Sequence, residues 1–145
     1  MLTQRLPGRT VAVEVDLVLH AGAPGARAGL AVLGDAYGWI GLQRGTDGQV
    51  HLVHRFAEAA AASERDAGHP RHAPDGRARL RIEAGAGARC RFLADVGDGF
   101  RPSGQVFAAT PWRWVGALLG LFAAAPAGRG HAGAADFTLF RITVL

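Results

Sequence analysis

The stretch that decides the fold is TVAVEVDLVLH, residues 10–20. Apolar side chains recur along it with a period of two, which is the pattern of a β-strand with one buried face. One strand cannot enclose a core by itself, so other elements of the chain must cover this face. The side chains predicted to point into the core are those of Val11, Val13, Val15, Leu17 and Leu19.

Short apolar runs of the same kind follow along the chain, separated by glycine, proline and aspartate. Residues 21–27 and 97–104 are predicted to be a loop and a glycine-rich turn, and 45–48 (Gly-Thr-Asp-Gly) a tight turn. Residues 57–76 carry Gly68 and two prolines, and they predict a long excursion between strands with at most one helical turn. Eight or nine short strands at such intervals are typical of a sandwich or jelly roll, so we predict an all-β fold of two antiparallel sheets. The further predicted strands are 28–33, 36–44, 49–56, 77–84, 88–96, 105–109, 115–123 and 135–144.

Residues 115–123 leave two interpretations open. Val115, Ala117, Leu119 and Leu121 would occupy one face of a strand with apolar residues on the other face too, as in a central strand covered on both sides. The rival interpretation is a buried helix, because this stretch contains few β-branched residues. The alternation favours the strand.

Size and composition indicate one globular domain over residues 1–145. About half of the residues are hydrophobic (49%), 19% are charged, and 21 are glycine, which suits a protein of strands and turns. The net charge is +4 and the sequence contains no lysine. The arginines are scattered, and the densest group alternates with apolar residues like the solvent face of two strands, so we expect no nucleic-acid partner. That group is Arg77, Arg79, Arg81, Arg89 and Arg91.

The remaining features of the composition concern redox chemistry and location. Cys90 is the only cysteine, so the chain cannot form an intrachain disulfide, and its place in the alternation predicts a small buried side chain. The N-terminus lacks an apolar signal core, and the longest apolar stretch, Trp114 to Ala127, is too short and glycine-broken to span a bilayer. We therefore expect a cytoplasmic protein with no membrane partner.

A resemblance to a known family rests mainly on residues 111–144, PWRWVGALLGLFAAAPAGRGHAGAADFTLFRITV. This stretch resembles the end of the C-terminal concanavalin A-like domain of family-43 β-xylosidases and arabinofuranosidases. Earlier pieces fall in the expected order: Thr3-Gln4-Arg5, Ala28-Gly29-Leu30, residues 79–83, and the hairpin CRFLADVGDGF at 90–100. The elements that carry the resemblance in the last third are Arg113-Trp114-Val115-Gly116, Gly120-Leu121-Phe122, Ala135-Asp136-Phe137 and Phe140-Arg141.

The sequence also departs from the pattern of that family. The hairpin has Ala94-Asp95 where Tyr-Ser is usual. The family domain usually begins several dozen residues earlier, so the chain is expected to be a fragment, a remnant gene product, or a domain that pairs with another chain. An unpaired sheet edge would then be exposed.

The resemblance implies a non-catalytic accessory domain of a glycoside hydrolase. Such a domain docks on a five-bladed catalytic propeller, in the same chain or in another, and shapes substrate access or oligomer contacts. The loop 123–134 is the counterpart of the one that leans on the propeller, with Arg129 and His131 as its polar residues. Phe122, which precedes this loop, and the group Trp112, Arg113 and Trp114 are the candidate interface residues, because tryptophan and arginine dominate interface hot spots.

A stand-alone carbohydrate-binding module is the alternative. Tyr37, Trp39 and Gln43 share one face of a predicted strand with Gly41, and aromatic rings flanked by glycine could stack on sugars derived from xylan or arabinan. The competing interpretation is that the two rings fill the core.

Catalysis by the chain itself is not predicted. Glycoside hydrolysis needs two carboxylates held across a sugar site, and the resemblance places these in the propeller. Glu14 and Asp16 are interpreted as solvated residues on one strand face, and Asp95 and Asp98 as residues of a turn, where aspartate caps backbone amides.

No cofactor or metal site is predicted either. His51 and His54 are three residues apart on a strand and so point to opposite faces, while His69 and His72 lack further ligands in a zinc spacing. Asp136 is the single candidate calcium ligand, because related sandwiches often carry calcium, but one carboxylate does not make a site.

Overall fold

The computed structural model describes residues 1–20, 22–59, 62–111, 116–127 and 133–145, and these form strands joined by short connections. The strands follow the predicted order, and residues 2–5, 65–66 and 71–72 form three strands that the sequence did not predict. Their bounds are β1 (Leu2–Arg5), β2 (Val11–Leu19), β3 (Arg27–Leu33), β4 (Tyr37–Arg44), β5 (Val50–Ala57), β6 (Arg65–Asp66), β7 (Arg71–His72), β8 (Arg77–Ala84), β9 (Arg89–Asp95), β10 (Arg101–Ala108), β11 (Leu118–Ala124) and β12 (Ala135–Val144), with a 3-10 turn η1 (Ala86–Ala88) before β9.

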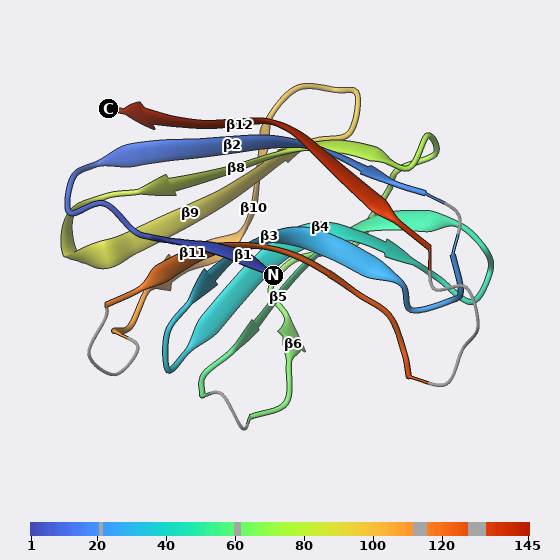
Figure 1. The fold of residues 1–145 in the computed structure, drawn as a ribbon, viewed down its shortest axis with the longest axis horizontal. Coiled ribbons are helices and arrows are strands. Elements are labelled where there is room, and N and C mark those ends of the chain that lie inside the picture. The colour runs from blue at the N-terminus through green and yellow to red at the C-terminus, as the bar shows by residue number, and fades with distance from the viewer. Residues whose placement is uncertain (21, 60–61, 112–115, 128–132) are drawn as a thin grey trace.

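Two antiparallel sheets lie face to face as two layers (Figure 1). A seven-stranded sheet has the order β1-β11-β3-β4-β5-β6, with β7 also paired to β5. A five-stranded sheet has the order β10-β9-β8-β2-β12, so the C-terminal strand lies at one of its edges. This architecture confirms the predicted all-β sandwich of two antiparallel sheets.

The strand predicted from residues 10–20 is β2, an inner strand of the five-stranded sheet between β8 and β12. Its residues Val11, Val13, Val15 and Leu17 are at most 1% exposed, and they pack against Leu30, Ile40 and Leu42 of the opposite sheet. Burying one such side chain fully stabilises the fold by about 1.5–3 kcal/mol before the entropy cost of ordering the chain. The alternate apolar residues of β2 therefore form one side of the core, because all of them face the opposite sheet.

The outer face of the five-stranded sheet carries cross-strand ion pairs. Arg81 Nη1 lies 2.6 Å from Glu14 Oε1, and Arg79 Nε lies 3.1 Å from Asp16 Oδ1. These pairs confirm that the arginines of β8 form a solvent face. The same ion pairs engage Glu14 and Asp16, the two carboxylates that the sequence predicts on one face of this strand.

The edge strand β10 corrects one prediction. Residues 97–104 were predicted to be a turn, but β10 begins at Arg101 and pairs with β9 from there. The pairing shifts between Ser103 and Phe107, and Gly104 within this bulge has φ of +63°. The bulge interrupts the alternation, which hides the first half of the strand in the sequence.

Two further segments differ from the prediction. The stretch 57–76 contains β6 and β7, both paired to β5, and its described part contains no helix. β11 confirms the strand interpretation of its segment over the helix, but it is not covered on both sides. Leu119 points into the core and is buried, whereas Phe122 points to the outer face of the sheet, which no further layer of the described residues covers, and is half-buried.

Two further predictions concern Cys90 and membrane-spanning helices. Cys90 is fully buried, and burial raises the pKa of its thiol to about 11, as expected for an unreactive core residue. The part of the chain that the structure describes includes no helix with the length and hydropathy of a membrane span.

Candidate functional site

The outer face of the seven-stranded sheet, turned away from the five-stranded sheet, carries a second apolar cluster. Residues of β3 that alternate with the core-facing ones lie on this face, as do Tyr37 and Trp39 of β4. An apolar cluster on the outer face of a sandwich is typical of a docking or binding surface, since such faces are usually polar. We call it the outer cluster; it consists of the buried residues Ala31, Trp39 and Val53 and the half-buried residues Leu33, Tyr37 and Phe122.

Glycines in β3 and β4 let the backbones of the two strands approach closely. Gly29 pairs with Gly41 on one side and with Phe122 on the other. A Cβ atom added to Gly41 would lie 2.0 Å from the backbone oxygen of Ala28, so the strand tolerates no side chain there. The rings of Trp39 and Phe122 meet edge to face, with centroids 5.1 Å apart and planes at 85°. Such an aromatic pair contributes about 0.5–1.5 kcal/mol beyond its buried area.

A single carboxylate anchors both polar groups of the aromatic pair on β4. Glu64 Oε1 accepts a hydrogen bond from the Tyr37 hydroxyl at 3.0 Å and another from Trp39 Nε1 at 3.2 Å. The guanidinium of Arg55 lies 5.9 Å from the Trp39 ring centroid, and its Nε is paired with Asp66 Oδ1 at 3.1 Å. These hydrogen bonds hold Glu64, which directly precedes β6, against the outer cluster.

The Tyr37 hydroxyl is electrostatically unusual. Its pKa is raised above the ordinary value, first by burial and then by the hydrogen bond and negative charge of Glu64, against a smaller opposing effect of Arg27. A cavity of about 320 Å³ opens beside it, and Arg27, Tyr37 and Glu64 line this cavity together with apolar residues of the outer cluster. The cavity can accept a side chain or a small ring from another molecule.

The structure places the three predicted carbohydrate-binding residues differently from one another. Trp39 is 2% exposed, so its neighbours cover most of the ring that would stack on a sugar. Tyr37 is half-buried and borders the open cavity. Gln43 lies on the same face of β4, but four residues beyond Trp39, about 13 Å at the strand rise, and it does not line the cavity. Its buried Oε1 has no hydrogen-bond partner among the described residues.

The predicted interface residues fall into two groups. Phe122 is part of the outer cluster. The predictions for Trp112, Arg113, Trp114, Arg129 and His131 fall outside the described residues.

Asp136, the candidate calcium ligand, and Asp95, which was weighed for catalysis, are both engaged with other groups. Asp136 Oδ2 lies 2.7 Å from His20 Nε2, and Asp95 Oδ1 accepts hydrogen bonds from the amides of Gly97 and Gly99. The hydrogen bond from the Gly97 amide, and to a smaller extent that from Gly99, lowers the pKa of the Asp95 carboxyl group. His51 and His54 point to opposite faces of β5, as predicted. Among the residues that the structure describes, no group of three histidine, cysteine, aspartate or glutamate side chains could hold a metal ion.

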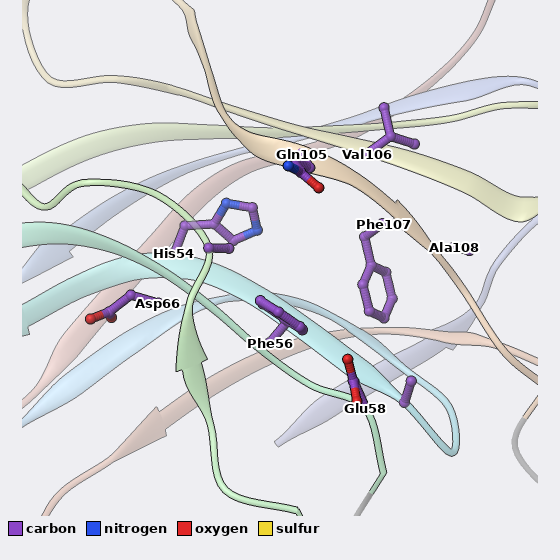
Figure 2. A pocket seen from close by; sticks show the side chains of 10 residues that line it. His54, Phe56, Glu58, Asp66, Gln105, Val106, Phe107 and Ala108 are labelled. Carbon is purple, nitrogen blue, oxygen red and sulfur yellow. The ribbon is translucent and has the colours of Figure 1, made fainter.

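Sequence reasoning missed a second cavity, of about 450 Å³, between β5, β6 and the edge strand β10 (Figure 2). We call it the His54 cavity, after the histidine in its wall. One signal could have found it: His54 follows Val50 and Leu52 at a spacing of two, which places a polar ring among core-facing residues.

Removing the charge of Glu64 is expected to lower the pKa of Tyr37. In Glu64→Gln the side chain can still accept a hydrogen bond, but the negative charge that opposes ionisation of the phenol is lost. Tyr37 is the only tyrosine of the chain, so its tyrosinate absorbance can be titrated without assignment. Glu58→Gln is the matched control, because Glu58 pairs with Arg65 instead. Equal titration curves for Glu64→Gln and the unmodified protein would contradict the contact.

The family model of the beta xylosidase C-terminal concanavalin A-like domain matches residues 1–143. A bifunctional GH43-CE protein of Bacteroides eggerthii has a TM-score of 0.85 at 21% identity, covering 99% of this chain and 18% of that one. A GH43 glycoside hydrolase engineered to display endo-xylanase and exo-arabinofuranosidase activity has a TM-score of 0.81 at 20% identity, covering 99% and 30%.

A xylan beta-1,4-xylosidase from Bacillus halodurans is similar as well, with a TM-score of 0.78 at 16% identity, covering 97% of this chain and 28% of that one. The chain thus spans no more than 30% of the length of any of these three proteins. Among curated protein sequences, none matches it.

Fold and family model together define the class of the protein, a concanavalin A-like β-sandwich of two antiparallel sheets. The chain belongs to the family of beta xylosidase C-terminal concanavalin A-like domains. Its match is to the C-terminal domain of family-43 glycoside hydrolases and not to their catalytic domain.

Proposed function

We propose that this chain is a non-catalytic accessory domain that docks on the catalytic propeller of a β-xylosidase-like glycoside hydrolase through the outer cluster. The observation that carries the proposal is an apolar, aromatic patch on the outer face of a sheet in a domain of this family. Propeller and sandwich can belong to one chain or to two. Shaping of substrate access by the loop 123–134 and contacts between copies are part of the same proposal.

The outer cluster lacks a complete cover among the described residues. Phe122 and Tyr37 are only half-buried, and Met1, 79% exposed, lies at the rim of the adjoining cavity. A partner that covered this face would remove apolar area from water at about 25 cal/mol per Å². An inserted aromatic or arginine side chain would have the Glu64 carboxylate and the Tyr37 hydroxyl as polar partners.

The acidic pairs of the chain favour a non-catalytic role. Glu14 and Asp16 are paired with arginines of β8, and Asp95 caps the amides of a turn. Asp16 and Asp95 line one cavity together, of about 370 Å³, but Asp16 is paired with Arg79 and Asp95 is bonded to the turn amides. A glycosidase needs two carboxyl groups about 5–10 Å apart across an open sugar site.

Binding to a catalytic domain is the direct test. The purified chain is expected to bind a family-43 propeller expressed without its own C-terminal domain, in a titration followed by calorimetry. Ala124 is exposed and lines the cavity beside Tyr37. Ala124→Arg is expected to weaken binding at least about tenfold, because it would bury an unpaired charge in the contact with the propeller.

Thr143→Arg is the matched control, since it adds the same charge at an exposed position of β12 in the other sheet and is expected to leave binding unchanged. Equal weakening by both variants would show that the outer cluster is not the docking face. Turnover of nitrophenyl glycosides by the chain alone would overturn the non-catalytic role. The stand-alone carbohydrate-binding alternative predicts quenching of tryptophan fluorescence by xylo-oligosaccharides that is lost in Trp39→Ala; the burial of Trp39 does not favour it.

A further inference from the structure

The edge strand β12 carries apolar side chains that face water. Of the seven large apolar side chains that are exposed among the described residues, four lie on β12 or directly after it. Single exposed apolar residues are common on protein surfaces, but a group of them on one strand indicates a contact with another chain. The four residues are Leu139, Phe140, Val144 and Leu145.

β12 also lacks most of the features that protect an open sheet edge. It is the last strand of the five-stranded sheet, beside β2, and at ten residues it is the longest described strand (Figure 1). Proteins usually keep open edges short or interrupt them with proline and bulges. β1 and β6 have four and two residues, and β10 carries Pro102 and a bulge. β12 contains no proline, and its one irregularity lies between Thr138 and Arg141.

The backbone of β12 turns hydrogen-bonding groups to its free side at defined positions. In an antiparallel ladder, the amide and carbonyl of successive residues point alternately to one neighbouring strand and to the other. The amide of Leu145 donates to the carbonyl of Thr10, and the amide of His20 donates to the carbonyl of Ala134. Alternation from these two bonds along the register with β2 gives the direction of the other groups. The residues whose amide and carbonyl point away from β2 are Ala135, Phe137, Ile142 and Val144.

A second copy of β12 matches these positions when the two strands run antiparallel about a two-fold axis. With the axis between Leu139 and Phe140, residues 135–138 of one strand lie opposite residues 141–144 of the other. Each residue whose backbone groups point away from β2 then meets another such residue. The irregularities of both strands coincide at the axis, so neither half of the ladder is interrupted.

The charges along β12 are complementary in the same register. Thr138 lies opposite Arg141 of the second copy, and Asp136 is the diagonal neighbour of that arginine on the same face, within reach of a long side chain. Glu14 lies opposite Arg141 on β2 but is already bonded to an arginine of β8. Asp136 contacts His20 through Oδ2, so its Oδ1 can accept from the second copy. The two-fold axis forms each contact twice.

We propose that the free edge of β12 is a dimer interface, in which a second copy of this chain pairs antiparallel with it and joins the two five-stranded sheets into one. Backbone hydrogen bonds form the contact, Leu139 and Phe140 of both copies pack around the axis, and opposite charges fix the register. This interface specifies the contacts between copies that the proposed function includes. It lies on the other sheet from the outer cluster, so it does not depend on docking to a propeller.

Analytical ultracentrifugation of the purified chain over a range of concentrations tests dimerisation. We expect a reversible dimer with a dissociation constant roughly in the micromolar range, because two paired strands bury less area than a standard interface. Hydrogen exchange at single amides then locates the contact. The amides of Phe137 and Ile142 are expected to exchange at least about tenfold more slowly in the dimer than in the dilute monomer. The amides of Asp136 and Thr143, which point to β2, are the internal control and are expected to change little.

Two substitutions on β12 test the register. Thr138→Arg, at an exposed position, places an arginine opposite Arg141 of the second copy, twice by symmetry, and is expected to weaken the dimer about tenfold. Adding Arg141→Glu converts each like-charge pair into an opposite-charge pair and is expected to restore most of the affinity. Gln105→Arg is the matched control, because it adds the same charge at an exposed position of β10, the other edge of this sheet, and is expected to leave the dimer unchanged. Circular dichroism verifies that each variant is folded.

Any of three results overturns the proposal. A chain that stays monomeric at every concentration would show that a second copy does not cover this edge. A dimer in which the amides of Phe137 and Ile142 exchange as in the monomer would place the contact elsewhere. Equal weakening by Thr138→Arg and by the double variant would exclude this register. Docking on a propeller is measured with a different partner and is disturbed by Ala124→Arg, so each proposal can fail alone.

Discussion

Acidifying the protein from pH 6.5 to pH 4 is expected to reduce its free energy of unfolding by about 3 kcal/mol through His54 alone. Burial lowers the pKa of this side chain from 6.5 to about 4, despite a smaller opposing effect of a backbone hydrogen bond at Ser103. Between these two pH values the unfolded chain binds a proton at His54 and the folded protein does not. Stability from this group is therefore complete above pH 6.5 and is lost as the pH falls towards 4.

Urea unfolding at a series of pH values measures this contribution. Carboxylates also titrate over the acidic part of the range, so the informative quantity is the difference between the protein and His54→Phe. That variant is expected to show a flatter profile between pH 6.5 and 4, because it has no proton to take up at this position. His69→Phe, which removes an exposed histidine, is expected to keep the slope of the unmodified protein. Parallel profiles for His54→Phe and the unmodified protein would mean that His54 becomes protonated in the folded state.

The sequence predicts those parts of the fold in which local alternation and burial coincide. Along β8, and along β2 from Val13 onward, every second side chain is buried and those between are not, so a period of two locates both the strand and its core face. The resemblance in the last third adds the family, which alternation cannot supply. It rests on residues such as Gly120 and Phe122, whose spacing follows from the packing of β11 against β3.

The candidate sites were harder to predict because their residues meet only through the folding of distant segments. Glu64 lies in a stretch without periodicity, yet it bonds to Tyr37 and Trp39, which are 27 and 25 residues away in the sequence. The His54 cavity depends on the bulge of β10 near Gly104, and the same bulge hid the start of that strand. Gln43 shares the sheet face of Trp39 but lies too far along the strand to contact the same ligand. Residues on one face of a strand therefore need not belong to one site.

Truncating the central ring of the outer cluster is expected to be the most damaging single change on that face. Trp39→Ala is expected to reduce the free energy of unfolding by about 3–5 kcal/mol, because it removes a ring that is 2% exposed and leaves a cavity between β3 and β5. It also removes the edge-to-face contact with Phe122 and one of the two hydrogen bonds to Glu64. Circular dichroism during urea unfolding measures the loss, since Trp112 and Trp114 complicate a fluorescence signal.

Trp39→Phe separates packing from hydrogen bonding at this position. Phenylalanine keeps an aromatic ring against Phe122 but cannot donate to Glu64, so it is expected to cost less than alanine does. If Trp39→Ala lowers stability by less than about 1 kcal/mol, the ring is not an integral part of the sheet and is free to serve as a sugar platform. If the loss is as large as expected, Trp39 supports the face while Phe122 and Tyr37 meet the partner. Docking should then be sensitive to Ala124→Arg in a protein of unchanged stability, and that combination distinguishes a supporting residue from a contacting one.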